Sequence, residues 1–422
     1  MWAYYAARIH AKKPEVQDPR NGPIQPVAMS SRRERAMQDK RVEWNRRQFM
    51  NAAAAVAAGG LTGASYAQDA GGPIVLGQSC ALSGPSAQLG TQFAQGAKLY
   101  FDQLNAQGGI GRRQVELRTL DDGYEPERCV SNTQKFIADD VMALFGYLGT
   151  PTSMAALPLL QKARLPLIAP LTGAAGLREP KLAQAVFNLR ASYADETALM
   201  VRQLVSLGLQ KIAVFHQNDA YGQSGLEGVT QALQSHGLKP VGAATVERNS
   251  RDVAKAVKTL VPLGADVIVQ VGTYAASAAF VRAARQAGYG GQFYNVSFVG
   301  TSALAQALGK EAEGVVVTQV VPSPFKTSHP LAREFQAALQ KSGASLQPDY
   351  SSMEGYLAAR VVGEALKSAA AAGRLQRDGL VAALEAMNGQ QVAGFPIAFR
   401  PQAGKPRFVE LSMLTGDGKV RV

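Results

Sequence analysis

Short apolar runs alternate with longer segments of helical periodicity from residue 73 onward. The apolar runs predict buried strands, and the longer segments predict helices. The alternation is typical of parallel βαβ units, and two successive sets of comparable size predict an α/β protein with two similar lobes. The predicted strands are 74–81, 115–120, 141–145 and 165–169 in the first set, and 211–215, 241–246, 266–271, 292–296 and 314–320 in the second.

A strand-to-helix loop in the stretch 143–153 is the first candidate for ligand binding. Thr150 is expected as the N-cap of the helix and Pro151 as its first residue. Helix N-termini present unpaired amides and a partial positive charge, and Gly149 would let a ligand approach the backbone. These features indicate either an anion-binding loop or an ordinary capped helix in a surface turn. Pro158 predicts a kink or a restart inside that helix.

Further candidates fall at the carboxyl ends of other predicted strands. A second loop of small residues, 170–176, should lie beside Thr150, because the ends of parallel strands share one edge of a sheet. Tyr147, Tyr221 and Tyr274 also follow predicted strands. Each tyrosine alone could serve ordinary packing, but three at matching positions indicate an aromatic-lined pocket.

Patterns typical of catalysis or of metal and nucleotide binding are missing from the sequence. The 4 histidines lack metal-ligand spacing, and neither cysteine belongs to a Cys-x-x-Cys pair. The glycines within 108–111 follow a predicted helix rather than a strand, so they indicate a turn. Asp121 and Asp122 end a predicted strand, where paired acids are more typical of turns. The sequence therefore predicts binding without turnover, with no cofactor and no metal.

Composition and charge fit a globular, ligand-binding chain. At 422 residues, with 46% hydrophobic and 18% charged residues, the chain suits about two domains. Residues 1–67 hold 11 Lys and Arg against 5 Asp and Glu, so half of the net charge of +12 lies there. The remainder is only mildly basic, and it has no Lys/Arg run with interleaved aromatics that would indicate nucleic-acid binding.

The N-terminal part reads as an export leader. Arg46 and Arg47 precede an Ala-rich stretch, 52–64, and small residues that end at Ala67, which together resemble a signal peptide of the Tat type. Cleavage after Ala67 would begin the mature chain at Gln68. The alternative, a membrane anchor, is disfavoured by the short, glycine-containing stretch.

Two further expectations concern the start of the chain and its thiols. The segment before the leader is polar and is not expected to fold, and Met29 or Met37 is the expected true start. Export to an oxidising compartment permits a disulfide between Cys80 and Cys129, with two buried free thiols as the alternative.

Several motifs, taken in order and spacing, resemble the substrate-binding proteins of ABC transporters of the branched-chain-amino-acid type. They are Ala-Leu-Ser-Gly-Pro at 81–85, Ala-Gln-Gly-Gly-Ile at 106–110, Asp-Asp-Gly-Tyr-Glu-Pro at 121–126, Gly-Tyr-Leu-Gly-Thr-Pro-Thr-Ser at 146–153 and Asp-Ala-Tyr-Gly at 219–222. The resemblance implies a periplasmic, monomeric, non-enzymatic protein of the type I periplasmic-binding-protein fold. Such a protein closes on a ligand and delivers it to a membrane permease.

The resemblance also implies how the chain is divided and which residues bind the ligand. Two doubly wound parallel-sheet lobes, 68–190 plus 322–393 and 191–321 plus 394–422, would be joined by three crossings. The ligand carboxylate would bind at the loops of Thr150 and Thr172, with aromatic contacts from the second lobe. The implied binding residues are Tyr147, Leu148, Gly149, Thr150, Thr172, Gly173, Tyr221, Tyr274, Ser297 and Tyr356.

The chain departs from the family pattern at two of these positions. Gly173 stands where amino-acid binders have a Thr, and Ser297 stands where they have the acid that pairs with the ligand's ammonium. A buried ammonium without a countercharge is costly. We therefore expect a ligand with a carboxylate and without an α-amine, such as an aromatic or short aliphatic acid. A ligand-sensing receptor of the same fold, or a periplasmic enzyme, is the alternative function.

Overall fold

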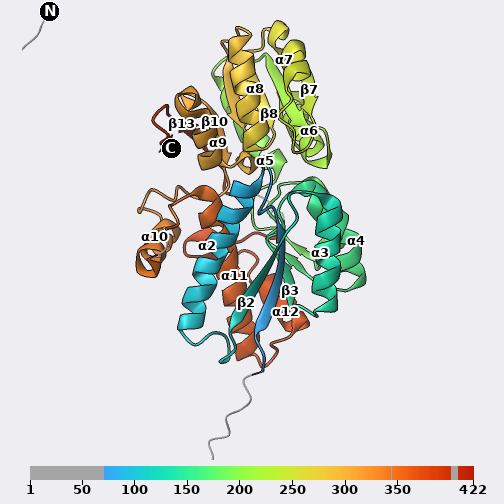
Figure 1. The fold of residues 1–422 in the computed structure, drawn as a ribbon, viewed down its shortest axis with the longest axis vertical. Coiled ribbons are helices and arrows are strands. Elements are labelled where there is room, and N and C mark those ends of the chain that lie inside the picture. Colours follow the sequence, from blue (N-terminus) through green and yellow to red (C-terminus); the bar gives the residue numbers. More distant parts are fainter. Residues whose placement is uncertain (1–70, 344, 401–406) are drawn as a thin grey trace, which may run out of the picture. The chain divides into compact units, whose positions relative to one another are not determined.

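A computed structural model describes residues 71–343, 345–400 and 407–422. The predictions about the leader, its Tat signal, the cleavage site and the start codon lie outside these residues. Within them, no helix combines the length and the apolar character needed to cross a membrane. The predicted α/β fold is confirmed, because the described chain forms two large sheets that are covered by helices (Figure 1).

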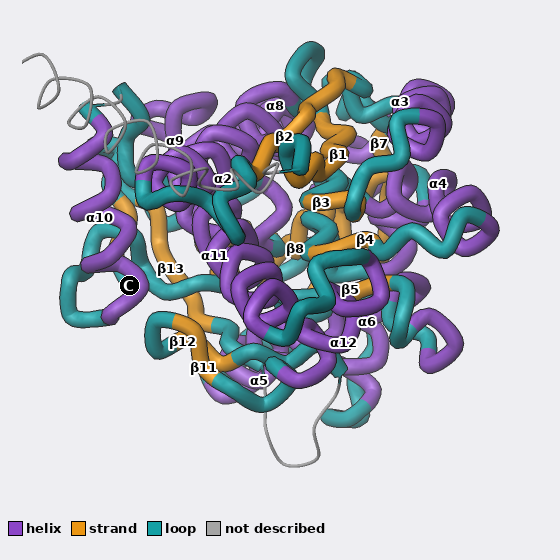
Figure 2. Tube along the Cα trace, turned by 90° about the horizontal axis from the view of Figure 1, so that it is seen from below, coloured by secondary structure: helices purple, strands orange, loops and turns teal. Residues whose placement is uncertain are grey.

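The first lobe is built on a five-stranded parallel sheet with the order β2-β1-β3-β4-β5. Helices α3 and α4 lie on one side of it and α2 with α11 on the other (Figures 1 and 2). The backbones of α2 and α11 come very close, since a Cβ at Gly96 would lie 1.8 Å from the Ser352 carbonyl oxygen. The elements are β1 Ile74–Cys80, α2 Ala87–Ala106, β2 Val115–Asp121, α3 Pro126–Ala138, β3 Ala143–Phe145, α4 Thr150–Lys162, β4 Leu167–Ile168, β5 Val186–Phe187, α10 Pro330–Ser342, α11 Tyr350–Ala371, α12 Arg377–Ala386, and the hairpin of β11 Gln391–Val392 and β12 Phe395–Pro396.

The second lobe is built on a seven-stranded sheet with the order β14-β13-β10-β9-β8-β6-β7. Strand side chains alternate between its faces: Ile212 and Val214 pack in the cluster with α5 and α6, whereas Ala213 and Phe215 pack in the cluster with α7, α8 and α9. Strands β13 and β14, from the C-terminal tail, pair antiparallel, so this sheet is mixed rather than wholly parallel. The elements are α5 Tyr193–Ser206, β6 Ile212–Gln217, α6 Ala220–Gln234, β7 Gly242–Val246, α7 Ala254–Leu260, β8 Val267–Val271, α8 Tyr274–Gln286, β9 Gln292–Asn295, α9 Thr301–Leu308, β10 Val316–Gln319, β13 Glu410–Leu414 and β14 Val420–Arg421.

Short 3-10 helices occupy several of the connections. They are η1 Ala175–Leu177, η2 Pro180–Leu182, η3 Val261–Leu263, η4 Ser297–Val299 and η5 Gly309–Ala312. The chain passes between the two lobes three times, through a first crossing (188–192), a second crossing (320–329) and a third crossing after β12. The lobe boundaries after Arg190, Val321 and Ala393 remain a prediction from the sequence.

One local expectation about the loop before α4 needs correction, and the structure narrows a second, the kink or restart at Pro158. Gly149, with φ at 95°, occupies the N-cap, and Thr150 is the first helical residue. The Thr150 hydroxyl is therefore directed to another side chain instead of capping its own helix. The helix also runs through Pro158 without a restart. Loss of one backbone hydrogen bond is tolerated there because Ala156 and Leu160 anchor the helix in the core.

The two cysteines are free and buried, so the alternative of two thiols is the one observed. Cys80 packs in the cluster with α2, and Cys129 packs in the cluster with α3 and α4. The neighbouring Ser79 accepts a hydrogen bond from Asn132 of α3. Since adjacent strand residues face opposite sides of a sheet, Cys80 points away from the helix that carries Cys129.

Candidate ligand-binding site between the lobes

Two threonines from neighbouring loops of the first lobe form a threonine pair. The Oγ atoms of Thr150 and Thr172 lie 2.6 Å apart and share a hydrogen bond, and the Thr172 Oγ lies 3.4 Å from the Tyr193 hydroxyl. A parallel bridge between Leu148 and Leu171 aligns the two loops. The structure therefore brings these loops side by side, as their positions after parallel strands predicted.

The other hydroxyls of the first loop play different parts. Thr152 donates its hydroxyl to the carbonyl oxygen of Leu148, so it closes the loop on itself. The Ser153 Oγ is buried and lacks a hydrogen-bond partner among the described residues. A Cβ at Gly149 would lie 2.2 Å from the Tyr124 ring. In this structure the glycine therefore makes room for an aromatic ring of its own chain.

An aromatic cluster of Tyr124, Tyr193, Tyr221 and Phe298 adjoins the threonine pair. Ring centroids are 5.3 Å apart for Tyr193 and Tyr221, 4.8 Å for Tyr221 and Phe298, and 6.0 Å for Tyr124 and Phe298. Tyr221 follows β6 and Phe298 follows β9, whereas Tyr124 follows β2 of the first lobe. All four rings are buried, so the cluster joins the two lobes.

The loop after β2 is what aims Tyr124 at the second lobe. Tyr124 has φ at 63°, and its backbone N–H donates to Oδ1 of Asp122. The Tyr124 hydroxyl accepts a hydrogen bond of 3.2 Å from Nε2 of Gln217, which ends β6. The acids at 121–122 therefore shape a turn, as expected from their position at a strand end. No pattern in the sequence predicted that this turn presents an aromatic ring to the other lobe.

Three tyrosines of the predicted site lie in other surroundings. Tyr147 hydrogen-bonds to Thr133 and packs in the cluster with α3 and α4. Tyr356 donates to Glu334 of α10, and its ring packs against Tyr100 and Phe335. Tyr274 begins α8 and packs against the hydrophobic cluster that contains Phe215 and Phe280. The direction of a side chain just beyond a strand end depends on local turn geometry, which the residue pattern does not define.

A buried charge cluster, made of Arg190, Glu196, Ser297 and Glu354, lies where the first crossing meets both lobes. The Arg190 side chain donates through Nη2 to the Ser297 Oγ, and its Nε forms an ion pair of 3.3 Å with Oε1 of Glu354. Glu196 of α5 accepts from the backbone N–H of Ser297 at 2.7 Å, from its Oγ at 3.0 Å, and from the Thr318 hydroxyl. Arg190 is 3% exposed and Glu354 8% exposed.

The arginine in this cluster is only partly satisfied. Nη1 of Arg190 is buried and has no hydrogen-bond partner among the described residues. Burial alone would lower the pKa of Arg190, but Glu354 and Glu196 outweigh it and raise that pKa above its ordinary value. Burial raises the pKa of Glu354 to about 6, against the opposing effect of Arg190. The guanidinium therefore stays charged, with an N–H group directed at no acceptor.

The charge cluster changes the expectation about Ser297. The sequence comparison left this position without an acid, yet Glu196 reaches the same place from another helix. Ser297 therefore holds the Glu196 carboxylate in place through its N–H and hydroxyl groups. Because an acid is present there after all, the absence of an acid at position 297 no longer argues against a ligand with an α-amine. In the sequence, Glu196 resembles an ordinary acidic residue in the first turn of a helix. Arg190 is a lone charge after an apolar run, so it alone offered a weak indication of a functional residue.

A rim contact, made of Glu125, Arg248 and Asn249, joins the lobes nearer to solvent. Nη2 of Arg248 lies 2.9 Å from Oε2 of Glu125, and Nδ2 of Asn249 donates to Oε1 of the same carboxylate at 2.7 Å. Asn249 also donates to the carbonyl oxygen of Gly123. The Arg248 and Glu125 side chains are 25% and 39% exposed. This contact holds the lobes together outside the buried part of the interface.

The described interface encloses very little space. A cavity of about 10 Å³ is lined by side chains that include Arg190, Ser297, Phe298 and Glu354. That volume is about what one water molecule needs. A ligand of the size of an amino acid or a small organic acid therefore enters only when the lobes move apart.

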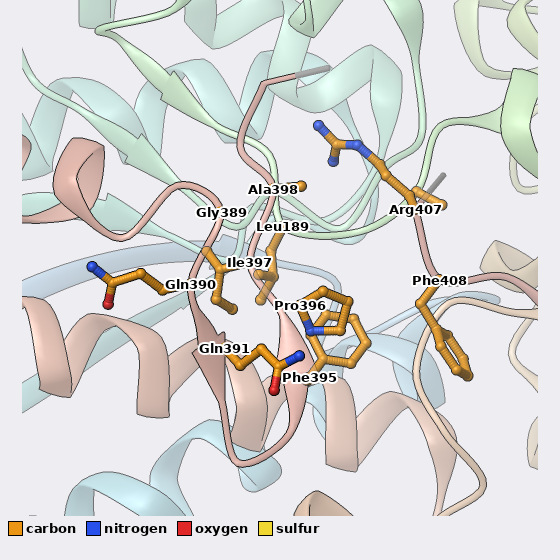
Figure 3. Close-up of a pocket in the computed structure, with 11 residues that line it drawn as sticks. Leu189, Gly389, Gln390, Gln391, Phe395, Pro396, Ile397, Ala398, Arg407 and Phe408 are labelled. Atoms are coloured by element: carbon orange, nitrogen blue, oxygen red, sulfur yellow. The ribbon is translucent and has the colours of Figure 1, made fainter. Parts of the chain in front are cut away.

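A second cavity, of about 230 Å³, lies among the crossings (Figure 3). Its walls come from the first and third crossings, the turn before β11, and the β11–β12 hairpin. The Arg407 guanidinium points away from the apolar side chains, and it donates to the carbonyl oxygens of Asn188 and Arg190. The residues predicted to bind ligand do not line this cavity. Within the described part of the chain, no group of three or more His, Cys, Asp and Glu side chains is placed to hold a metal ion.

Two α/β lobes that are joined by three crossings, with polar and aromatic side chains from both lobes meeting between them, define a two-lobed ligand-binding protein. The chain belongs to the periplasmic binding protein family, whose sequence model matches residues 73–408. Members of this family are substrate-binding proteins rather than enzymes, and they act in the periplasm, which supports the same location for this chain.

Individual relatives support this assignment. The chain is 27% identical to the Leu/Ile/Val-binding protein of Escherichia coli (strain K12), over 65% of this chain and 75% of that protein. A possible leucine/isoleucine/valine-binding protein from Rhodopirellula baltica has a similar structure, with a TM-score of 0.77 and 33% identity, over 83% of this chain and 95% of that one. A substrate-binding periplasmic protein from Ralstonia solanacearum gives a TM-score of 0.77 and 32% identity, over 82% of this chain and 99% of that one. The predicted type I periplasmic-binding-protein fold and the predicted family are thereby confirmed.

Proposed function

We propose that this protein captures a small ligand with a carboxylate between its lobes and delivers it to the permease of an ABC transporter. Export to the periplasm by the Tat route, as a monomer, is part of the proposal. The transport role follows from the family and from relatives that are named as amino-acid-binding proteins. The nature of the ligand follows from the side chains at the interface.

The proposal that the ligand has a carboxylate rests on Nη1 of Arg190, which is buried and has no hydrogen-bond partner among the described residues. A buried N–H without an acceptor costs about 1–3 kcal/mol, and a carboxylate would supply a charge-assisted hydrogen bond in its place. The threonine pair is tied to this point, because Arg178 donates to the carbonyl oxygens of both Thr172 and Arg190. The proposal places Arg190 and the two threonine hydroxyls around one carboxylate group.

The aromatic cluster supports an apolar body on the ligand. Rings from both lobes meet beside the threonine pair, so an aliphatic or aromatic group could replace their mutual contacts when the lobes part. Glu196 and Glu354 could also face an ammonium group. The proposed ligand is therefore an amino acid or an aromatic or aliphatic acid.

The proposed site combines predicted residues with others that the structure adds. From the prediction it keeps the Thr150 and Thr172 side chains, the Leu148, Gly149 and Gly173 backbone, Tyr221 and Ser297. The structure adds Arg190, Tyr193, Phe298 and Tyr124. We leave Tyr147, Tyr274 and Tyr356 out of the proposed site, because each packs in one of the other clusters described above.

Closure follows from how these contacts are divided. The threonine pair belongs to the first lobe, whereas Tyr221 and Ser297 belong to the second. A ligand that touches both halves binds the closed state better than the open state, so it shifts the population toward closure. A permease can then distinguish loaded from empty protein by lobe position.

Native mass spectrometry of the protein purified from its host tests this proposal. We expect a co-purified small molecule that carries a carboxyl group, and a ligand without an acidic group would contradict the proposed site. Cross-linking in membranes of the host is the companion measurement for the partner. Adducts with permease subunits are expected, and adducts with a signalling receptor instead would favour the sensing alternative.

A further inference from the structure

The buried charge cluster contains more acid than base. The Arg190 guanidinium faces Glu354 on one side and, through Ser297, Glu196 on the other. Around Glu354 the other cavity walls are uncharged: Thr301 of α9, Leu89 of α2, Gln319 of β10, and Tyr350 and Ser351 of its own helix. Arg178 and Arg407 lie beyond, where both donate to the backbone carbonyl oxygen of Arg190, and neither forms a hydrogen bond or ion pair with Glu354 among the described residues. One guanidinium thus serves two carboxylates before any ligand is bound.

A ligand carboxylate at Nη1 of Arg190 would be the third acid around this single cation. The space there holds about one water molecule, so solvent screens the added charge poorly. Three ionised carboxylates around one guanidinium in a buried site repel one another strongly, and such groups respond by taking up a proton. One of the two resident acids is therefore expected to become neutral.

The two resident acids are held very differently. Glu196 accepts three hydrogen bonds, from the Ser297 N–H, the Ser297 hydroxyl and the Thr318 hydroxyl. Glu354 has only the ion pair with Arg190 to offset its burial. A ligand carboxylate would compete for that same guanidinium. Glu354 is therefore the acid that neutralises most easily.

We propose that binding of the ligand's carboxylate at Arg190 is coupled to the uptake of one proton by Glu354, an inference that rests on the function proposed above. The proton comes from solvent and attaches to a carboxylate oxygen of Glu354, while the ligand's carboxylate takes over the guanidinium. Glu354 acts here as a positioning residue, because it controls how available Arg190 is.

The pKa of Glu354 determines how the affinity for a carboxylate changes with pH. Burial raises its pKa to about 6, so below that pH the acid is largely neutral and leaves Arg190 free. Above it, Glu354 is ionised and competes with the ligand for the guanidinium. Affinity is therefore highest at acidic pH and falls by up to about tenfold per pH unit above the pKa.

Formate is a suitable probe, because it is the smallest carboxylate and stays ionised over the range in question. Its affinity for the ligand-free protein would be measured by calorimetry at about pH 5.5 and about pH 7.5, with sodium chloride as a matched salt control. We expect formate to bind roughly ten to thirty times more weakly at the higher pH. Titrations in two buffers of different ionisation heat should show an uptake of about one proton per formate near pH 7.

Two variants complete the design. Glu354→Gln should bind formate with nearly the same affinity at both pH values. Asp122→Asn is the matched control, since Asp122 is also buried with a pKa raised to about 6, but its carboxylate accepts hydrogen bonds from Ser79 and from the Tyr124 N–H within the first lobe. The side-chain oxygen of Asn can keep the bond to Tyr124. This control should keep the pH dependence of the unaltered protein. If Glu354→Gln does not fold, the proton count of the unaltered protein still decides the question.

The outcomes separate the two proposals. Equal formate affinity at both pH values, without proton uptake, would overturn the coupling and leave the proposed function standing. Failure of formate to bind at either pH, beyond the effect of sodium chloride, would overturn the carboxylate anchor at Arg190 and with it both proposals.

Discussion

The two lobes meet through charged side chains in two places, and these places differ in kind. The buried charge cluster lies at the centre, where its charged side chains are largely shielded from water, and it leaves an N–H of Arg190 without an acceptor among the described residues. The rim contact is partly exposed, and its Glu125 carboxylate accepts from both Arg248 and Asn249. Exposed ion pairs contribute about 0–1 kcal/mol, whereas breaking a buried pair costs about 3–5 kcal/mol.

This difference indicates that the rim contact and the central cluster have different effects on lobe closure. A weak, water-exposed contact can form and break as the lobes move, so the rim contact biases closure without fixing it. The central cluster is costly when incomplete, so it responds strongly to a group that completes it. We infer that the centre recognises the ligand and that the rim sets how often the empty protein closes.

The largest effect is expected from Arg190→Met, which removes the only cation of the central cluster. Glu354 would remain buried without its ion-pair partner, and Glu196 would keep its hydrogen bonds but lose the nearby cation, so the free energy of unfolding should fall by about 3–5 kcal/mol and carboxylate binding should be lost. Denaturant unfolding and calorimetry measure the two effects. Arg190→Lys is the control, because it keeps the charge and should recover part of the stability. A fully stable Arg190→Met protein would contradict the importance of the centre.

The next effect concerns the pH dependence of stability. The pKa of Glu354 is raised to about 6 in the folded protein from its ordinary value of 4.5, so folding favours the protonated form. This contribution is complete below the unfolded pKa and is lost as pH rises through the folded pKa. Between about pH 4 and pH 7 it should remove about 2 kcal/mol from the free energy of unfolding.

Glu354→Gln should abolish that share of the pH dependence, as followed by urea unfolding at a series of pH values. An unaltered slope in Glu354→Gln would mean that the central acid is not held near its titration point by burial.

A smaller loss is expected from Thr172→Val, which keeps the shape of the side chain and removes its hydroxyl. The Thr150 Oγ and the Ala174 N–H would both lose a buried partner, which should cost about 1–2 kcal/mol of stability. Affinity for a carboxylate should fall as well. Thr152→Val serves as the control, because that hydroxyl bonds only within its own loop among the described contacts. Equal effects on ligand affinity in both variants would argue against a role for the threonine pair.

The sequence predicted the strands and loops that form this site better than the side chains that meet in it. Apolar runs define strands, and the carboxyl ends of parallel strands share an edge, so the neighbourhood of Thr150 and Thr172 was predictable. The C-terminal strands extend the second sheet in the antiparallel sense, which short apolar stretches in a tail do not reveal. Tyr147 follows a strand as expected, but its ring turns into the core with α3 and α4.

The central cluster could not be predicted in the same way. Arg190, Glu196 and Glu354 come from a crossing, the start of α5 and the start of α11, and only the three-dimensional packing of both lobes brings them together. Glu196 and Glu354 each resemble an ordinary helix surface charge, and only Arg190, a lone charge after an apolar run, offered a weak signal. The sequence correctly indicated that position 297 carries no acid. What the sequence could not show is that a different helix supplies the charge.

The smallest effect is expected at the rim, and it is the most direct test of the comparison. Glu125→Gln and Arg248→Gln, alone and combined, form a double-mutant cycle whose coupling energy should be about 0.2–1 kcal/mol and should decrease at high salt. Asn249 keeps an acceptor in Glu125→Gln, so the backbone arrangement should survive. Small-angle scattering should find the empty variants open more often, with ligand affinity reduced by no more than about fivefold. A coupling energy as large as that of a buried pair would mean that the rim, rather than the centre, holds the lobes closed.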